Sequence, residues 1–242
     1  MKPAHTLQNL TSPHSWAELP WGEYYRGALE QQLQPWWPKL FGFHLLKIGN
    51  LSAALDTEKC VISHQVKVGL QGSNLDVLAD PYQLPFAAKS VDACLLAHTL
   101  SYADNPHRML REIDRVMIDD GWLIISTFNP FSLLGLGKLI PGLRQRQPYV
   151  SRMFSQMRLL DWLSLLNYEV MEQSRFHVLP WQRKGGTFLG THLPALGCLS
   201  VIVARKRTLP LTPTPMKFGV RKPSLSRAVG ATKSYRKPGN AP

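Results

Sequence analysis

Hydrophobic and polar residues follow the clearest pattern between residues 75 and 130. Short apolar runs at residues 75–79, 91–97 and 122–127 predict three strands. The middle run is almost continuously apolar, as in a strand that is buried on both faces. Between the last two runs, apolar residues recur every three or four positions across residues 106–117, which predicts an amphipathic helix that begins with a proline. Strand, strand, helix and strand in this order indicate half of an open α/β sheet.

Polar residues follow the ends of these runs, where open α/β sheets bind their ligands. Asp80 follows the first run, His98 the second, and Asn129 with Pro130 the third. His98 is a candidate general base, because an imidazole titrates near neutral pH, and it is equally a candidate for a hydrogen-bonded structural residue. Asn129 and Pro130 are candidates for lining an acceptor pocket, although Asn-Pro is also a common turn dipeptide.

The rest of the pattern extends the same architecture. A helix is expected from residue 22 to about residue 40, where Pro35 and Pro38 break it. Further strands are expected at residues 45–48, 60–68, 168–176 and 197–204, a turn at residues 119–121, and a helix at residues 151–166. Together the runs predict a sheet of seven strands.

Residues 131–143, FSLLGLGKLIPGL, form an apolar, glycine-bearing segment that is flanked by Arg144 and Arg146. One interpretation is a lid over an apolar substrate or a segment that touches a membrane surface. The other is a short packed helix, which the length of the segment fits. Both interpretations stay open at this point.

Motifs between residues 79 and 127 narrow the fold further. Residues 79–86 contain the pattern A-D-x-x-x-L-P-F, Val91 and Asp92 open the next strand, and residues 111–116 contain R-E-x-x-R-V. In this order the motifs resemble the second half of the class I S-adenosylmethionine (SAM)-dependent methyltransferases of type 11, including a small bacterial member of uncharacterised function. The resemblance implies an α/β fold with a Rossmann-like, seven-stranded, mostly parallel and doubly wound sheet. It also implies SAM as cofactor and methyl transfer. Our first hypothesis is therefore a methyltransferase that acts on a small or apolar acceptor.

The same resemblance implies where SAM is held. Gly49 corresponds to one glycine of the family's loop after the first strand. Asp80 corresponds to the residue that accepts a hydrogen bond from the adenine amino group, with Pro81 and Leu84 beside it. His98 follows a strand end at which family members line the methyl-transfer cavity.

The first half of the chain departs from the family's pattern. In the family the first strand leads into D/E-x-G-x-G-x-G, whose glycines let the backbone approach the cofactor. Lys47 stands where the acid is expected, and Leu51 stands at a glycine position. An acid that would hold the ribose hydroxyls is not evident in residues 60–68. A second hypothesis therefore stays open, in which the chain is a catalytically inactive methyltransferase-like protein that binds a partner.

Positive charge is concentrated near the C-terminus. Residues 205–242 hold ten Lys and Arg and no acid, so that residues 1–204 carry only +2 of the net charge of +12. With several prolines and few large apolar residues, this basic tail is predicted to be disordered. It is a candidate for contacting nucleic acid or an anionic membrane, or it only aids solubility. We expect an N-terminal segment with its helix packing on the core (residues 1–43), a methyltransferase-like domain (44–204) and the tail (205–242).

Cysteine usage and hydropathy indicate the cellular compartment of the protein. Cys60, Cys94 and Cys198 fit neither a C-x-x-C metal pair nor a disulfide framework. No apolar run approaches the roughly 20 residues of a membrane span, and no secretory signal is evident. The sequence therefore predicts a cytoplasmic protein without a transmembrane segment or a metal site.

Overall fold

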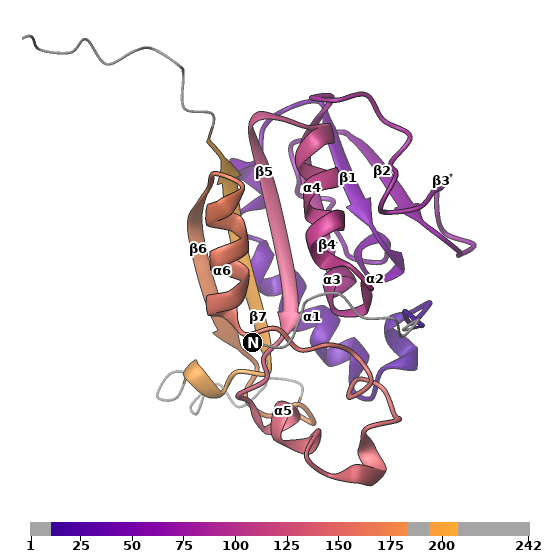
Figure 1. The fold of residues 1–242 in the computed structure, drawn as a ribbon, viewed down its shortest axis with the longest axis vertical. Coiled ribbons are helices and arrows are strands. Elements are labelled where there is room, and N and C mark those ends of the chain that lie inside the picture. Colours follow the sequence, from indigo (N-terminus) through magenta and orange to yellow (C-terminus); the bar gives the residue numbers. More distant parts are fainter. Residues whose placement is uncertain (1–10, 183–193, 208–242) are drawn as a thin grey trace, which may run out of the picture. The chain divides into compact units, whose positions relative to one another are not determined.

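A computed structural model of the chain describes residues 11–182 and 194–207. Within these residues, strands pair into one sheet in the order β3-β2-β1-β4-β5-β7-β6 (Figure 1). The strands are β1 (His44–Ile48), β2 (His64–Gly69), β3 (Val77–Leu78), β4 (Val91–Ala97), β5 (Met117–Phe128), β6 (Tyr168–Phe176) and β7 (Leu199–Lys206). The first five are parallel, whereas β7 runs antiparallel to both β5 and β6. The predicted Rossmann-like, seven-stranded, mostly parallel sheet is confirmed.

Helices cover both faces of the sheet. They are α1 (Gly22–Leu33), α2 (Asn50–Ala53), α3 (Thr99–Tyr102), α4 (Pro106–Val116), α5 (Leu133–Gly137) and α6 (Gln156–Leu165). Buried side chains of α4 and α6 pack on one face, and those of α1 and α2 pack on the other. In Figure 1, α4 and α6 lie in front of the sheet and α1 lies behind it. No helix in the described part of the chain is long and apolar enough to cross a membrane.

β4 lies at the centre of this arrangement, and all of its residues are buried. Cys94 and Leu96 face the layer of α4 and α6, whereas Ala93 and Leu95 face the layer of α1. Its pairing with β1 on one side and β5 on the other leaves no exposed edge. The continuous apolar run in the sequence therefore has the predicted cause, which is burial on both faces.

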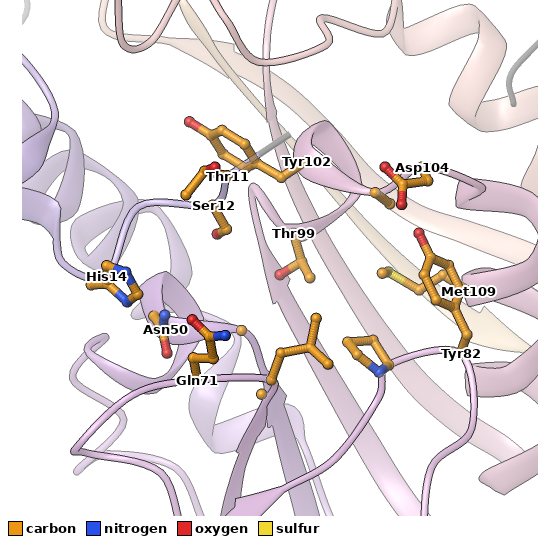
Figure 2. A pocket seen from close by; sticks show the side chains of 15 residues that line it. Thr11, Ser12, His14, Asn50, Gln71, Tyr82, Thr99, Tyr102, Asp104 and Met109 are labelled. Carbon is orange, nitrogen blue, oxygen red and sulfur yellow. The ribbon is translucent and has the colours of Figure 1, made fainter. Parts of the chain in front are cut away.

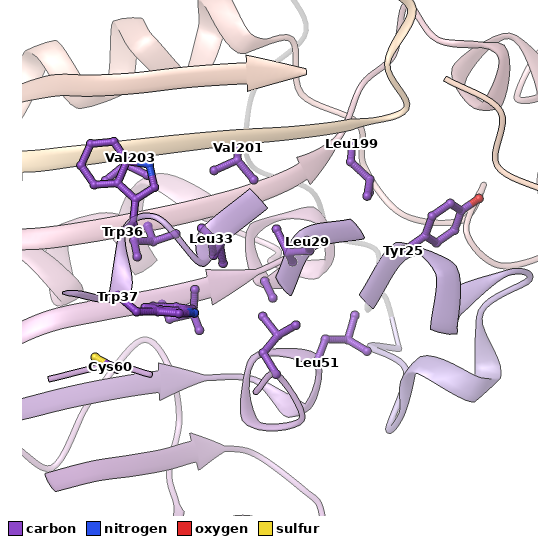
Figure 3. Close-up of a cluster of buried hydrophobic side chains, with 14 of the residues drawn as sticks. Tyr25, Leu29, Leu33, Trp36, Trp37, Leu51, Cys60, Leu199, Val201 and Val203 are labelled. Carbon is purple, nitrogen blue, oxygen red and sulfur yellow. The ribbon is translucent and has the colours of Figure 1, made fainter. Parts of the chain in front are cut away.

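The N-terminal region completes the core on the α1 face. Tyr25, Leu29 and Leu33 recur on one side of α1 and are fully buried against the sheet. Trp37 closes the end of this layer from a 3₁₀ turn, Trp37–Lys39, as Figure 3 shows. Truncation of a buried aromatic residue of this kind costs about 3–5 kcal/mol. The described part of the N-terminal region is therefore an integral part of the fold.

Several element boundaries differ from the sequence-based expectation; β2, for example, begins at His64 instead of residue 60. β5 begins at Met117 and includes the expected turn at residues 119–121, because its pairing with β4 shifts register near Val91 and the extra residues are taken up inside the strand. α1 ends at Leu33, ahead of Pro35, instead of continuing to residue 40. α6 begins at Gln156 instead of residue 151.

β7 extends to Lys206, two residues into the segment assigned to the tail. The expected disorder and the nucleic-acid or membrane contacts of the tail concern mainly residues 208–242, which lie outside the described residues. The domain boundaries at residues 43 and 204 stay predictions.

Candidate active site

A cavity of about 470 Å³ lies at the carboxyl ends of the parallel strands. Its walls come from the turn after β1, the end of β2, the segment after β3 and the segment after β4, as Figure 2 shows. A further wall comes from Thr11, Ser12 and His14, far upstream in the sequence. Open α/β sheets bind ligands at this edge, so the cavity occupies the position at which a ligand is expected.

The turn after β1 brings the main chain to the cavity surface. Gly49 has a φ of +91°, a conformation that favours glycine, and its amide donates to the Val68 carbonyl at 2.7 Å. A Cβ at this position would lie 2.9 Å from Thr99 Oγ1. The Thr99 and Ser52 hydroxyls each donate to the Ile48 carbonyl at 2.6 Å. Two hydroxyl groups thus fix the turn whose other glycines are missing from this sequence.

Lys47 occupies the β1 position at which the family carries an acid, and it does not line the cavity. Its side chain is buried, and Nζ donates to the Leu55 carbonyl at 3.1 Å. Burial lowers the pKa of this amine to about 8. The substitution therefore places a cation inside the α1 layer without presenting it to the cavity.

The end of β2 presents amide groups instead of a carboxylate. Gly69, Leu70 and Gln71 line the cavity here, and Leu70 is largely exposed. Asn50 approaches from the turn after β1, and in Figure 2 its side chain lies near that of Gln71. Neither amide was singled out from the sequence, although Asn50 directly follows Gly49. This part of the site offers hydrogen-bonding groups without charge.

Two of the expected residues after β3, Asp80 and Leu84, do not line the cavity. Pro81 lines the cavity, whereas Asp80 is exposed and its Oδ1 accepts a hydrogen bond from the Tyr82 amide at 2.9 Å. Leu84 is buried in the core below. Tyr82 itself lines the cavity, and its hydroxyl accepts from the Asn105 amide at 3.1 Å. The turn of Asp80 thus positions Pro81 and Tyr82 at the surface of the cavity.

The segment after β4 forms the opposite wall. Thr99, Tyr102 and Met109 line it together with Asp104, which is the carboxylate among the described lining residues. Figure 2 shows Asp104 and Met109 on the same side of the cavity as Tyr82. Burial raises the pKa of Tyr82 above its usual value, so its hydroxyl remains protonated at neutral pH. This end of the site combines aromatic surface with one carboxylate.

His98 precedes this wall but does not line the cavity. Its ring is fully buried, stacks on Phe128 with a centroid separation of 4.1 Å, and contacts the edge of Trp16 at 5.6 Å. Neither ring nitrogen has a hydrogen-bond partner among the described residues. Burial lowers the pKa of His98 to about 3, so the imidazole is neutral at physiological pH.

Asn129 and Pro130 also lie outside the cavity lining. The buried Asn129 amide donates to the carbonyls of Ala195 and Gly197 at 2.9 and 2.8 Å, and its oxygen accepts from the Phe131 amide. These contacts tie the end of β5 to the chain that enters β7. Of the expected site residues, the structure therefore brings Gly49 and Pro81 to the cavity, and the assigned roles of all of them stay predictions.

One side chain braces the outer wall of the cavity. Gln147 accepts a hydrogen bond from the Tyr102 hydroxyl at 2.7 Å and donates to the Thr11 carbonyl at 3.4 Å. Nearby, the Arg152 amide donates to the Ser101 carbonyl at 2.8 Å. The segment after α5 is thus joined both to the N-terminal wall and to the wall after β4. Sequence reasoning could not identify this link, because its three parts are far apart along the chain.

Comparison with known proteins gives concordant results. The family model described as "Methyltransferase domain" (Methyltransf_11) matches residues 45–125, which span β1 to most of β5. The uncharacterised protein YafS of Escherichia coli (strain K12) is 62% identical over 238 residues, which cover 98% of this chain and 99% of that protein.

Solved structures share the fold at low sequence identity. The putative methyltransferase in complex with the Trm112 activator of Haloferax volcanii superposes with a TM-score of 0.57 at 13% identity, covering 77% of this chain and 91% of that one. A SAM-dependent methyltransferase of Archaeoglobus fulgidus superposes with a TM-score of 0.54 at 16% identity, covering 75% and 94%.

Proposed function

Because this chain belongs to the class I SAM-dependent methyltransferases of type 11, we propose that it transfers a methyl group from SAM to a small or apolar acceptor. The position of the cavity supports this proposal most directly. It lies at the carboxyl ends of β1, β2 and β4 and contacts Gly49, the residue retained from the family's glycine-rich loop. Its volume of about 470 Å³ is in the range of sites for ligands of this size.

We infer that the cavity fits SAM, although Asp80 does not line it and no carboxylate follows β2. At Gly49 the bare backbone forms the wall, since a Cβ would collide with Thr99. The ribose hydroxyls would meet the amides of Asn50 and Gln71 instead of a carboxylate, because Leu70 follows β2. Neutral hydrogen bonds are weaker than charge-assisted ones, and the cofactor is therefore expected to bind less tightly than with an acid at this position.

Catalysis then depends mainly on positioning. SAM supplies an activated methyl group, and transfer needs the acceptor atom held in line with it. Tyr82, Tyr102 and Met109 would enclose the acceptor and exclude water from it. We assign to Asp104 the hydrogen bond from an acceptor N–H or O–H, in preference to His98, which is outside the cavity lining.

Calorimetric titration with SAM and with its demethylated product tests the proposal. The full-length chain is expected to bind with a Kd in the micromolar range, about −8 kcal/mol. Gly49→Ala is expected to weaken binding roughly tenfold or more, because it strains a left-handed residue and crowds Thr99. The matched control is Gly27→Ala in α1, where a Cβ meets no atom within 4 Å. Absence of both heat and thermal stabilisation at millimolar SAM would refute the enzyme proposal and favour the partner-binding alternative.

A second variant tests the ribose side of the cavity. Leu70→Asp supplies a carboxylate at the end of β2 and is expected to tighten SAM binding by roughly tenfold, since charge-assisted hydrogen bonds exceed neutral ones by about 1–2 kcal/mol. Leu78→Asp is the control, because Leu78 is similarly exposed but does not line the cavity. Equal affinities for Leu70→Asp and the unaltered chain would mean that the ribose does not lie beside β2.

We also propose that the protein is located in the cytoplasm. All three cysteines of the chain are free and buried, which is compatible with a reducing cytoplasm.

A further inference from the structure

A group of large apolar side chains is exposed around α5. These side chains belong to Phe131, Leu133, Leu136, Leu139 and Ile140, and each is between 41% and 69% exposed. We call this group the α5 patch. Figure 1 shows α5 beyond the carboxyl end of β5, at the same edge of the sheet as the strand ends that form the cavity.

The fold fixes these side chains outward. Leu134 is buried and anchors α5 in the α1 layer. A Cβ on Gly135 would lie 2.0 Å from the Pro130 carbonyl oxygen, and a Cβ on Gly137 would lie 2.6 Å from the Tyr149 ring. The helix therefore packs tightly through its two glycines and cannot rotate to bury the α5 patch.

The stretch of sequence that contains the α5 patch carries positive charge only. No Asp or Glu stands between Asp120 and Asp161, whereas this stretch holds five cations. Two of them, Arg144 and Arg146, are exposed and follow the α5 patch by a few residues. Aliphatic and aromatic side chains next to exposed arginines are the combination that inserts into the acyl boundary of a bilayer and contacts lipid phosphates. Nucleic acid would use the arginines but would leave the aliphatic side chains exposed to water.

From these observations we propose that the α5 patch docks this chain on the surface of an anionic lipid bilayer. The α5 patch would enter the acyl boundary, and Arg144 with Arg146 would bind the phosphates of acidic lipids. The segment that follows is joined to the cavity wall through the Gln147–Tyr102 hydrogen bond of 2.7 Å. Docking thus holds the cavity close to the membrane. If the chain transfers methyl groups as proposed above, its acceptor is then an amphiphilic molecule that resides in the bilayer.

Flotation with lipid vesicles tests the docking surface. The full-length chain is expected to float with phosphatidylcholine vesicles that contain about one-third phosphatidylglycerol, and far less with phosphatidylcholine alone. The triple variant Leu136→Ser, Leu139→Ser and Ile140→Ser is expected to weaken binding to the anionic vesicles by roughly tenfold or more, because it removes the side chains that enter the bilayer. Its thermal unfolding should stay unchanged, since all three side chains are exposed.

The matched control removes three exposed apolar side chains from the opposite edge of the sheet. Phe43, Val61 and Leu165 are exposed and precede β1, β2 and β6. Their replacement by serine should leave vesicle binding unaltered. Both variants retain the basic tail, so any contribution of residues 208–242 is the same in each.

A charge variant separates the two parts of the surface. Arg144→Gln with Arg146→Gln is expected to weaken binding to anionic vesicles by roughly tenfold. The proposal is overturned if the unaltered chain does not bind anionic vesicles, if it binds only nucleic acid, or if the triple variant binds vesicles as well as the control does. Vesicle binding requires no SAM, so its outcome is independent of the test for methyl transfer.

Discussion

His98 shows how burial determines the chemistry of a single side chain. Its imidazole is enclosed by Phe128 and Trp16, and its nitrogens have no hydrogen-bond partner among the described residues. A protonated ring would therefore be buried without compensation, which explains the pKa of about 3. In the unfolded chain the same ring titrates near pH 6.5.

This difference predicts a pH-dependent stability. Below about pH 6.5 the unfolded chain binds a proton that the folded chain excludes, so His98 lowers the free energy of unfolding progressively as the pH falls towards 3. The slope from this residue is about 1.4 kcal/mol per pH unit. In His98→Asn, which keeps a residue that tolerates the left-handed backbone, urea unfolding between pH 7 and pH 4 should show a slope smaller by this amount. An unchanged slope would mean that the imidazole is already protonated in the folded chain.

At the scale of elements, the two family motifs of this sequence hold each other in place. Glu112 on α4 accepts a hydrogen bond from the Leu84 amide at 2.8 Å. Arg115 donates to the carbonyls of Leu84 and Phe86 at 3.1 Å and pairs with Glu112 at 2.7 Å. The hydrogen bond from Arg115 lowers the pKa of Glu112. The pair of Glu112 and Arg115 thus fixes the loop that carries Pro81 and Tyr82 to the cavity.

Removal of the arginine should loosen this loop. Arg115→Leu is expected to lower the free energy of unfolding by about 1 kcal/mol, because it removes an ion pair and two hydrogen bonds to carbonyls at a partly exposed position. Arg111→Leu, an exposed change on the same helix, should stay within about 0.5 kcal/mol. Chemical denaturation of both variants measures the difference, and equal stabilities would show that the link contributes nothing.

At the scale of the whole molecule, the end of the described chain is tied into the fold beyond the boundary expected at residue 204. Lys206 Nζ lies 3.0 Å from Asp114 on α4 and donates to the Asp114 carbonyl at 2.7 Å. The Arg207 amide donates to the Asn167 carbonyl at 2.9 Å. The folded unit therefore includes residues that composition alone assigned to the basic tail.

Two truncations distinguish these boundaries. A chain that ends at Thr208 keeps all of these contacts and should unfold at nearly the same temperature as the full chain. A chain that ends at Ala204 should lose about 2 kcal/mol or more, because the partly buried Lys206 and its partners are separated. Differential scanning calorimetry compares them. Equal stability of the two truncated chains would support residue 204 as the boundary.

The sequence predicted the back half of the fold better than the candidate site. β4 and β6 have the predicted bounds, since burial on both faces and the alternation along an outer strand depend on local pattern. The cavity lining depends on residues that meet only in three dimensions. Thr11 precedes β1 in the sequence and Gln71 follows it, yet both line the cavity. His98 was placed correctly at the end of a strand, but its burial follows from Trp16, whose approach no local pattern indicates.

The position of β7 also determines how long one edge of β5 stays unpaired during synthesis of the chain. Residues Leu199–Arg205 pair with Trp122–Phe128 of β5, and β6 joins the sheet only through β7. On the ribosome, β5 therefore emerges long before the strand that covers its edge. Until residue 205 has been translated, a hydrophobic strand edge stays open to pairing with other chains. Among the strands that the structure describes, β7 is synthesised last, and its pairing covers this edge of β5.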